Sequence, residues 1–183
     1  MPDDHEVDRI ELGRRLYAVS YTEGKFALSA GGVSSYYLDK FQFATRPELL
    51  RAVAVELAAR VPAATTRLAA PVLGAVPFGT AVSLETGLPL VIVRKEPKAY
   101  GAQRQFEGVL EPGDEVTIVE DIVTTGSESL RTARAVRAAG ADVVAIVAII
   151  DREQGGAQNI ADAGFPFTTL FVQSEIQPSA VAS

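Results

Sequence analysis

The 183-residue chain lacks cysteine and tryptophan, and its only histidine is His5. Without cysteine the protein can form no disulfide, no thiolate nucleophile and no cysteine-based zinc site. A lone histidine near the start of the chain also argues against a serine–histidine nucleophile or a histidine-ligated metal. These absences exclude much of the known enzyme chemistry.

Long hydrophobic runs are also missing. The longest candidate, 143–150, has the length of a strand and falls far short of the ~18 residues of a membrane span. Residues 1–10 carry several acids and no apolar segment of the kind found in secretory signals. We therefore expect a cytoplasmic protein that has no contact with a membrane.

Positive charge is scarce, because 17 Lys and Arg residues stand against 23 Asp and Glu residues, a net charge of −6. A protein that coats nucleic acid usually has the opposite sign, so no nucleic-acid partner is expected. Lysine is rare even within the basic set, with Lys25, Lys40, Lys95 and Lys98 as its members. Two of these lie within four residues directly after Arg94, which makes that segment worth explaining.

The length suits one domain with a substantial hydrophobic core, and 48% hydrophobic against 22% charged residues is typical of a globular protein. No internal repeat, low-complexity segment or long linker divides the chain. We expect a single domain over 1–183. Within it, residues up to about 45 would form a helix and a small hood, and residues from about 46 onward would form the core.

The segments before residue 67 contain three predicted elements. Apolar spacing predicts a short helix over about 7–19. Alternating residues on either side of Gly31-Gly32 predict a hairpin over about 25–39. Thr45 and Glu48 resemble a capping box, and apolar residues at steps of four follow, which predicts a helix.

Beyond residue 67, short apolar segments alternate with helical ones. The strands are expected at 68–73, 90–93, 115–119, 143–150 and 167–172, with helices at about 80–85 and 130–139. Continuous apolar strands indicate a sheet that is covered on both faces, so we expect an α/β fold with a mostly parallel central sheet flanked by helices. Ligands of such sheets bind at the carboxyl ends of the strands.

The segment 116–127 has the clearest chemical signal. A predicted strand ends in Glu120 and Asp121, and a Thr-Thr-Gly-Ser loop then opens the next helix. Free backbone N–H groups at a helix N-terminus favour a phosphate, whereas carboxylates accept hydrogen bonds from sugar hydroxyls. The combination suits a phosphorylated ribose. The alternative is a plain strand-to-helix turn capped by Thr125 or Ser127.

A second segment, Arg94 to Gly101, places three cations within five residues directly after a strand. Lysine is a flexible point charge that suits a phosphate or diphosphate, and the connection from 95 to 114 is long enough to form a lid. The alternative is a solvated loop with an ordinary charge cluster.

The third segment, 151–156, follows the most hydrophobic strand. The planar fork of Arg152 matches the two oxygens of a ligand carboxylate. The alternative is an ion pair with Asp151 or Glu153. No Walker A or G-x-G-x-x-G sequence is present, so classical nucleoside-triphosphate and dinucleotide sites are not supported. The glycines of 74–79 follow another strand and give only a weak signal of a turn at the site.

Residues 119–127 resemble the phosphoribosyl-pyrophosphate (PRPP) signature of type I phosphoribosyltransferases. Three further segments are similar to those of the orotate phosphoribosyltransferases within that superfamily, in an archaeal-like form. Residues 94–101 resemble their catalytic loop, 151–156 their orotate-site strand end, and 26–39 their N-terminal hood. The resemblance extends in order from about residue 20 to residue 172.

The resemblance implies an enzyme that transfers phosphoribosyl from PRPP to orotate, giving orotidine 5′-monophosphate and pyrophosphate, a step of pyrimidine biosynthesis. It implies Mg²⁺ bound together with PRPP, no dedicated metal site in the protein, and a homodimer whose loops reach into the neighbouring subunit's site. The implied catalytic residues are Lys98 and Asp121. The implied PRPP-binding residues are Arg94, Lys95, Lys98, Tyr100, Glu120, Asp121, Ile122, Val123, Thr124, Thr125, Gly126, Ser127 and Glu128. The implied orotate-binding residues are Thr124, Arg152, Tyr37 and Leu38.

The chain also departs from the pattern of this family. Ser29 and the Pro77-Phe78-Gly79 segment lack lysines found in many or some members, and Ala99 and Tyr100 replace an acid and a histidine. Lys25 or Lys40 would then have to compensate for the missing cations. Two other functions remain open: transfer to another base such as a purine, which carries no carboxylate for Arg152, and a non-catalytic PRPP-sensing module.

Overall fold

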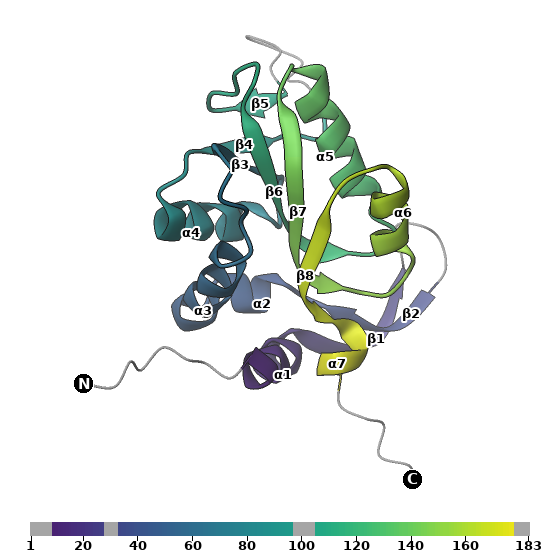
Figure 1. Ribbon diagram of the computed structural model, residues 1–183. Helices are drawn as coiled ribbons and strands as arrows, with labels where there is room; N and C mark the ends of the chain where they lie inside the picture. Colours follow the sequence, from purple (N-terminus) through teal and green to yellow (C-terminus); the bar gives the residue numbers. More distant parts are fainter. Residues whose placement is uncertain (1–8, 28–32, 97–104, 178–183) are drawn as a thin grey trace, which may run out of the picture.

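The computed structural model describes residues 9–27, 33–96 and 105–177 (Figure 1). Its centre is a six-stranded sheet in the order β5-β4-β3-β6-β7-β8. The strands are β3 (Arg67–Pro71), β4 (Leu90–Val93), β5 (Phe106–Glu107), β6 (Glu115–Val123), β7 (Asp142–Asp151) and β8 (Phe167–Val172). All neighbours pair in parallel except β4 and the short edge strand β5. The predicted mostly parallel α/β fold is confirmed.

Helices cover both faces of this sheet (Figure 1). On one face lie α3 (Pro47–Ala58) and α4 (Val76–Thr86), and on the other lie α5 (Ser127–Ala138) and α6 (Gly156–Asp162). Each face has its own apolar core, one centred on Leu57 and Phe78 and the other on Val136 and Ile160. Burial on both sides explains why the central strands are nearly continuous runs of valine, isoleucine and alanine.

The N-terminal part forms a separate layer below the sheet (Figure 1). Helix α1 (Arg9–Ser20) leads into an antiparallel pair of β1 (Tyr21–Ala27) and β2 (Val33–Leu38), followed by the short helix α2 (Phe41–Ala44). We call the β1–β2 pair the hood. The predicted helix and hairpin are present, although β1 begins earlier than expected, and Gly31 and Gly32 lie outside the described residues.

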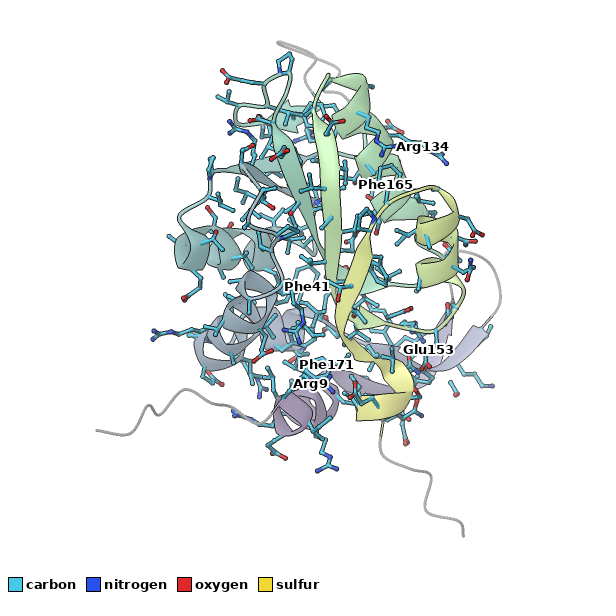
Figure 2. The ribbon with its side chains drawn as sticks, viewed as in Figure 1. Arg9, Phe41, Arg134, Glu153, Phe165 and Phe171 are labelled. Carbon is cyan, nitrogen blue, oxygen red and sulfur yellow. The ribbon has the colours of Figure 1, made fainter. Side chains whose placement is uncertain are left out.

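The C-terminal helix α7 (Gln173–Ile176) packs against α1. Arg9 pairs with Glu175, donates 2.6 Å to the carbonyl of Leu170 and lies 5.5 Å from the ring centroid of Phe171 (Figure 2). Gly13 is so close to Ile176 that an added Cβ would lie 2.4 Å from its Cγ2. The two end segments of the described chain therefore brace the same side of the molecule.

The predicted capping box at the start of α3 is wrong. The hydroxyl of Thr45 donates 2.7 Å to the carbonyl of Phe41 and so closes α2, which the sequence did not predict. The residue that precedes α3 is Arg46, without a side-chain cap, and Pro47 begins the helix. The helix itself is correctly predicted, because Leu49, Val53 and Leu57 are all buried. A hydroxyl that lies between two helices can cap either one, and spacing does not distinguish them.

None of the helices in the described ranges is both long and apolar enough to cross a lipid bilayer.

Candidate active site

Four connections meet at the carboxyl edge of the sheet, because β3, β4, β6 and β7 run in parallel. Strands β6 and β7 stay paired as far as Val123 and Asp151, and the N–H of Arg152 still donates 2.8 Å to the carbonyl of Val123. The segments that follow β6 and β7 therefore lie side by side, whereas the basic segment begins after β4, on the other side of β3 in the sheet. This edge is where ligands of open α/β sheets bind.

The acid pair does not end the strand, as the sequence suggested, but lies inside it. Strand β6 continues to Val123, and both Glu120 and Asp121 are only 4% exposed. Because successive residues of a strand point to opposite faces, the two carboxylates contact different elements. Glu120 faces α5, whereas Asp121 faces the connection after β3 and the start of α2.

Glu120 is enclosed between β6 and α5. One carboxylate oxygen accepts a 3.0 Å hydrogen bond from the hydroxyl of Ser129, and the other lies 3.3 Å from the N–H of Asp121. Burial, followed by the neighbouring charge of Asp121, raises the pKa of Glu120 to about 8. Near neutral pH this side chain therefore tends to keep its proton, so the acid pair carries less negative charge than its sequence implies.

Asp121 is held by groups from three parts of the chain. Its Oδ2 lies 2.5 Å from Nζ of Lys40, and its Oδ1 accepts from the N–H of Ile122 at 2.6 Å. Gly74, in the connection between β3 and α4, packs directly on this pair. An added Cβ there would lie 1.8 Å from Oδ2 of Asp121 and 2.5 Å from Nζ of Lys40. Any side chain at this position would displace the carboxylate or the ammonium.

The contact with Asp121 distinguishes Lys40 from Lys25, the two lysines that could replace the cations missing from this chain. Lys25 is exposed on β1, whereas Lys40 reaches the acid of the candidate site. The Pro77-Phe78-Gly79 segment lies within α4, so the weak signal at 74–79 marks a turn only around Gly74. Sequence spacing gave no sign of the contact between Lys40 and Asp121, which are far apart in the chain.

The loop from Thr124 to Glu128 joins β6 to α5. Gly126 adopts φ 75°, the left-handed region that favours glycine, and it precedes the first residue of α5. The backbone N–H groups of the first turn of α5 face outward from the helix end, where a phosphate would be stabilised. The predicted phosphate cradle, Thr124–Glu128, is thus a helix N-terminus at the carboxyl edge of the sheet.

Helix α6 supports this cradle from the side. The side-chain amide of Asn159 donates 3.0 Å to the carbonyl of Thr125. An added Cβ at Gly156 would lie 2.4 Å from Cγ1 of Val123 and 2.5 Å from the carbonyl of Thr124. Sequence reasoning missed both supports, although the Gly155-Gly156 pair was a visible signal of close backbone packing.

The basic loop begins at the same edge. Strands β4 and β5 pair Val93 with Phe106, and the N–H of Arg94 donates 2.8 Å to the carbonyl of Gln105. The base of the loop is therefore fixed next to the site. Within the described residues, Nε of Arg94 is buried without a hydrogen-bond partner, and Lys95 is exposed. Lys98 and Tyr100 lie outside the described residues.

Arg131 on α5 connects the loop to the cradle. It donates to the carbonyl of Lys95, lies 3.4 Å from the carbonyl of Arg94, and pairs with Glu128 in the first turn of the same helix. Arg131 had no distinguishing pattern in the sequence, because half-buried arginines are common on helices.

The base end of the site is formed by Arg152 and the hood. Arg152 donates 2.9 Å to the hydroxyl of Tyr36 and 3.0 Å to the side-chain oxygen of Gln173. Tyr37 is 44% exposed, whereas Leu38 is 4% exposed and belongs to the core. Because its side chain is buried, Leu38 could contact a ligand only through its backbone.

Three chemical functions thus lie along one edge. The cradle suits a phosphate, the carboxylate of Asp121 suits sugar hydroxyls, and the guanidinium of Arg152 suits a carboxylate. In the described part of the chain, no group of three His, Cys, Asp or Glu side chains is arranged to hold a metal ion.

Residues 50–176 match the phosphoribosyl transferase domain family. The chain therefore belongs to the phosphoribosyl transferase family. It is 44% identical to the orotate phosphoribosyltransferase of Halobacterium salinarum over 92% of this chain and 95% of the relative. It is 43% identical to that of Pyrococcus horikoshii over 86% of each chain.

A solved structure supports the same relationship. The crystal structure of the Mycobacterium tuberculosis orotate phosphoribosyltransferase in complex with PRPP superposes with a TM-score of 0.75 at 27% identity, covering 93% of this chain and 99% of the other. Within the family, the resemblance to orotate phosphoribosyltransferases of archaeal type, predicted from the motifs, is confirmed.

Proposed function

We propose that the protein is an orotate phosphoribosyltransferase, which transfers phosphoribosyl from PRPP to orotate to give orotidine 5′-monophosphate and pyrophosphate. The observation that carries this proposal is the position of Arg152 at the same sheet edge as the cradle and Asp121. Purines carry no carboxylate for such an arginine. The names of the similar archaeal proteins support the same substrate.

The proposed reaction breaks the bond between C1 of the ribose and the diphosphate oxygen and forms a bond from C1 to N1 of orotate, with inversion. Orotate is already an anion, so no histidine or cysteine base is needed. Thr124–Glu128 would bind the 5-phosphate, and Asp121 would bind the ribose hydroxyls. Glu120 is also predicted to bind them, which requires its carboxyl group to exchange the hydroxyl of Ser129 for the sugar. The charge of Asp121 would also stabilise positive charge that develops on the sugar.

The leaving diphosphate is proposed to be bound by Arg94, Lys95 and Lys98 of the basic loop, together with Tyr100. A closed loop would exclude water and hold the reactants in line. We expect Lys98→Ala to lower turnover by roughly 100-fold and PRPP affinity far less, because this cation acts on charge that grows in the transition state. Steady-state kinetics at varied PRPP would measure both, and undiminished turnover would remove this role.

Mg²⁺ is proposed to enter as a complex with PRPP and to neutralise part of its diphosphate charge. The described donor set fits this arrangement, because Asp121 is already paired with Lys40 and Glu120 has a raised pKa. Activity should therefore depend on Mg²⁺ in proportion to the PRPP–Mg²⁺ complex.

A homodimer with shared active sites is also proposed. Large apolar side chains are exposed on the neighbouring helices α3 and α4 and just before α4, namely Val55 at 43%, Leu84 at 82% and Leu73 at 69%. Exposed large apolar side chains on neighbouring elements suit a subunit interface. Sedimentation of the protein should give twice the chain mass of 19.4 kDa. The cytoplasmic location and the division into hood and core near residue 45 stay predictions.

The direct test is the loss of orotate's ultraviolet absorbance on addition of PRPP and Mg²⁺. We expect the wild type to consume orotate and Arg152→Ala to lose at least about 100-fold in kcat/KM for orotate. Arg51→Ala, an exposed arginine on α3, is the matched control and should behave as wild type.

The same assay separates the two other functions. If the wild type leaves orotate untouched but releases pyrophosphate with adenine, guanine or hypoxanthine, the protein transfers to a purine. If PRPP binds in equilibrium dialysis and no base is consumed, the protein is a PRPP-binding module.

A further inference from the structure

The guanidinium of Arg152 is held by two neutral side chains. Its Nε donates 3.0 Å to Oε1 of Gln173, and its Nη2 donates 2.9 Å to the hydroxyl of Tyr36. The amide of Gln173 also donates 2.6 Å to the same hydroxyl, which closes a triangle of hydrogen bonds. Among the described residues, Nη1 has no hydrogen-bond partner.

The acids next to Arg152 in the sequence do not neutralise it. Oδ1 of Asp151 accepts from the N–H of Glu153 at 2.9 Å. The carboxylate of Glu153 accepts from the N–H and the hydroxyl of Ser174, at 2.8 and 3.0 Å. Glu153 adopts φ 57°, an uncommon conformation for a residue with a side chain, and its carboxylate is bound to the start of α7. In the described part of the chain Arg152 forms no ion pair.

Tyr36 is itself fixed by the aromatic side chains of the hood. Its ring stacks on Tyr21 with centroids 5.6 Å apart, and Tyr21 stacks on Tyr17 of α1 at 5.1 Å. The guanidinium carbon of Arg152 lies 5.3 Å from the ring centroid of Tyr36. Burial raises the pKa of Tyr17 to about 12, so the inner end of this column stays protonated and uncharged at neutral pH.

We propose that Tyr36 and Gln173 are positioning residues that set the substrate specificity of the site by holding Arg152 without cancelling its charge. They fix two of its nitrogens with neutral acceptors and leave Nη1 for the carboxylate of the base. A carboxylate partner would hold the guanidinium equally well but would compete with the substrate. This inference rests on the proposed function.

The test is a Gln173→Glu variant measured beside Gln173→Ala and Tyr36→Phe. Glu has the shape of Gln and still accepts from Nε of Arg152. It cannot donate to the hydroxyl of Tyr36 as Gln173 does, but this hydroxyl can turn and donate to the new carboxylate, so a residue with a purely structural role would tolerate the change. If neutrality matters, Gln173→Glu should raise the KM for orotate at least about tenfold, and more than Gln173→Ala or Tyr36→Phe, each about fivefold. The KM for PRPP should change less than twofold in all three.

Thr168→Glu, at an exposed position on β8, is the control for an added acid and should leave both constants unchanged. Thermal melts of each variant check that the fold is retained, and Tyr36→Phe provides an independent removal of one bond if a Gln173 variant does not fold. Raised pH should not restore orotate binding in Gln173→Glu, because the guanidinium of Arg152 keeps the new acid ionised.

An active wild type with an unchanged KM for orotate in Gln173→Glu would overturn this inference and leave the proposed function intact. Equal changes in the KM for orotate and PRPP would also overturn it, because they indicate a general loss of structure. A wild type that does not consume orotate would overturn the proposed function and this inference together.

Discussion

Two opposite charges near the carboxyl ends of β6 and β7 have different kinds of partner. At β6, Asp121 is paired with a cation, Lys40, at 2.5 Å. After β7, the groups that hold Arg152 in the described part of the chain are the neutral ones of Tyr36 and Gln173. The first arrangement reduces the local negative charge beside a site that is proposed to bind a polyphosphate. The second preserves the positive charge for an anion. The difference shows that partner choice, as well as residue type, decides what each strand end can bind.

The largest effect should come from filling the space beside Asp121. An added Cβ at Gly74 would lie 1.8 Å from its carboxylate oxygen, so Gly74→Ala must displace Asp121 or Lys40. We expect kcat/KM for PRPP to fall by roughly 100-fold, because Asp121, the proposed ribose-binding acid, loses its position. Thr80→Ala on the exposed side of α4 is the control. A Gly74→Ala enzyme with near-normal kinetics would show that this junction tolerates movement.

Removing the cation at β6 should have the next largest effect. Lys40→Met keeps the aliphatic stem but leaves Asp121, only 4% exposed, without its ionic partner. We expect the KM for PRPP to rise about tenfold and the protein to lose about 3 kcal/mol of unfolding free energy. The KM for orotate should be nearly unchanged, which kinetics with each substrate varied would establish.

Lys40→Arg should recover most of the PRPP affinity, and Lys25→Met, at an exposed position on β1, should have no effect. If Lys40→Met instead raised the KM for orotate, the charge of Lys40 would also act on Arg152. The charges near the ends of β6 and β7 would then not be independent, contrary to the comparison drawn here.

The smallest effect concerns the pH dependence of stability. Burial and Asp121 raise the pKa of Glu120 from 4.5 to about 8, so the folded state binds more protons than the unfolded state between these values. The contribution of Glu120 to stability is therefore fully present below about pH 4.5 and is lost as the pH rises through about 8.

Glutamine at position 120 cannot ionise, so Glu120→Gln should remove this loss of stability with rising pH. We expect wild type to lose at least about 1 kcal/mol relative to the variant between pH 5 and 8. Urea unfolding at several pH values would measure it, with Glu111→Gln at an exposed position as the control. Parallel curves for wild type and Glu120→Gln would mean that Glu120 ionises normally.

Sequence periodicity predicted the sheet well for a physical reason. Strands covered on both faces must be apolar throughout, so Leu90–Val93 and Phe167–Val172 have the predicted bounds. Helices α6 and α7 were not predicted, because a helix of one or two turns contains too few residues to show a period. The extension of β6 to Val123 was missed because the acid pair interrupts its apolar pattern.

Local sequence also identified the chemically important segments but not their partners. The cradle and Arg152 lie in short segments whose residue types can be recognised from adjacent positions in the sequence. Lys40, Tyr36 and Gln173 act on groups that the fold brings from far away in sequence, and each looks unremarkable in its own surroundings. Such contacts depend on tertiary packing, which a single sequence does not encode in any local pattern.

The hydrogen bond from Gln173 to Tyr36 has a consequence for biosynthesis. The two residues are 137 positions apart, whereas Asn159 and Thr125, which meet at the phosphate cradle, are 34 positions apart. As the chain leaves the ribosome, Thr125 and Asn159 of the phosphate end are synthesised before Gln173, the hydrogen-bond partner of Tyr36. The residues of the proposed sugar-phosphate site are therefore all synthesised before Gln173, the last of the residues that hold Arg152.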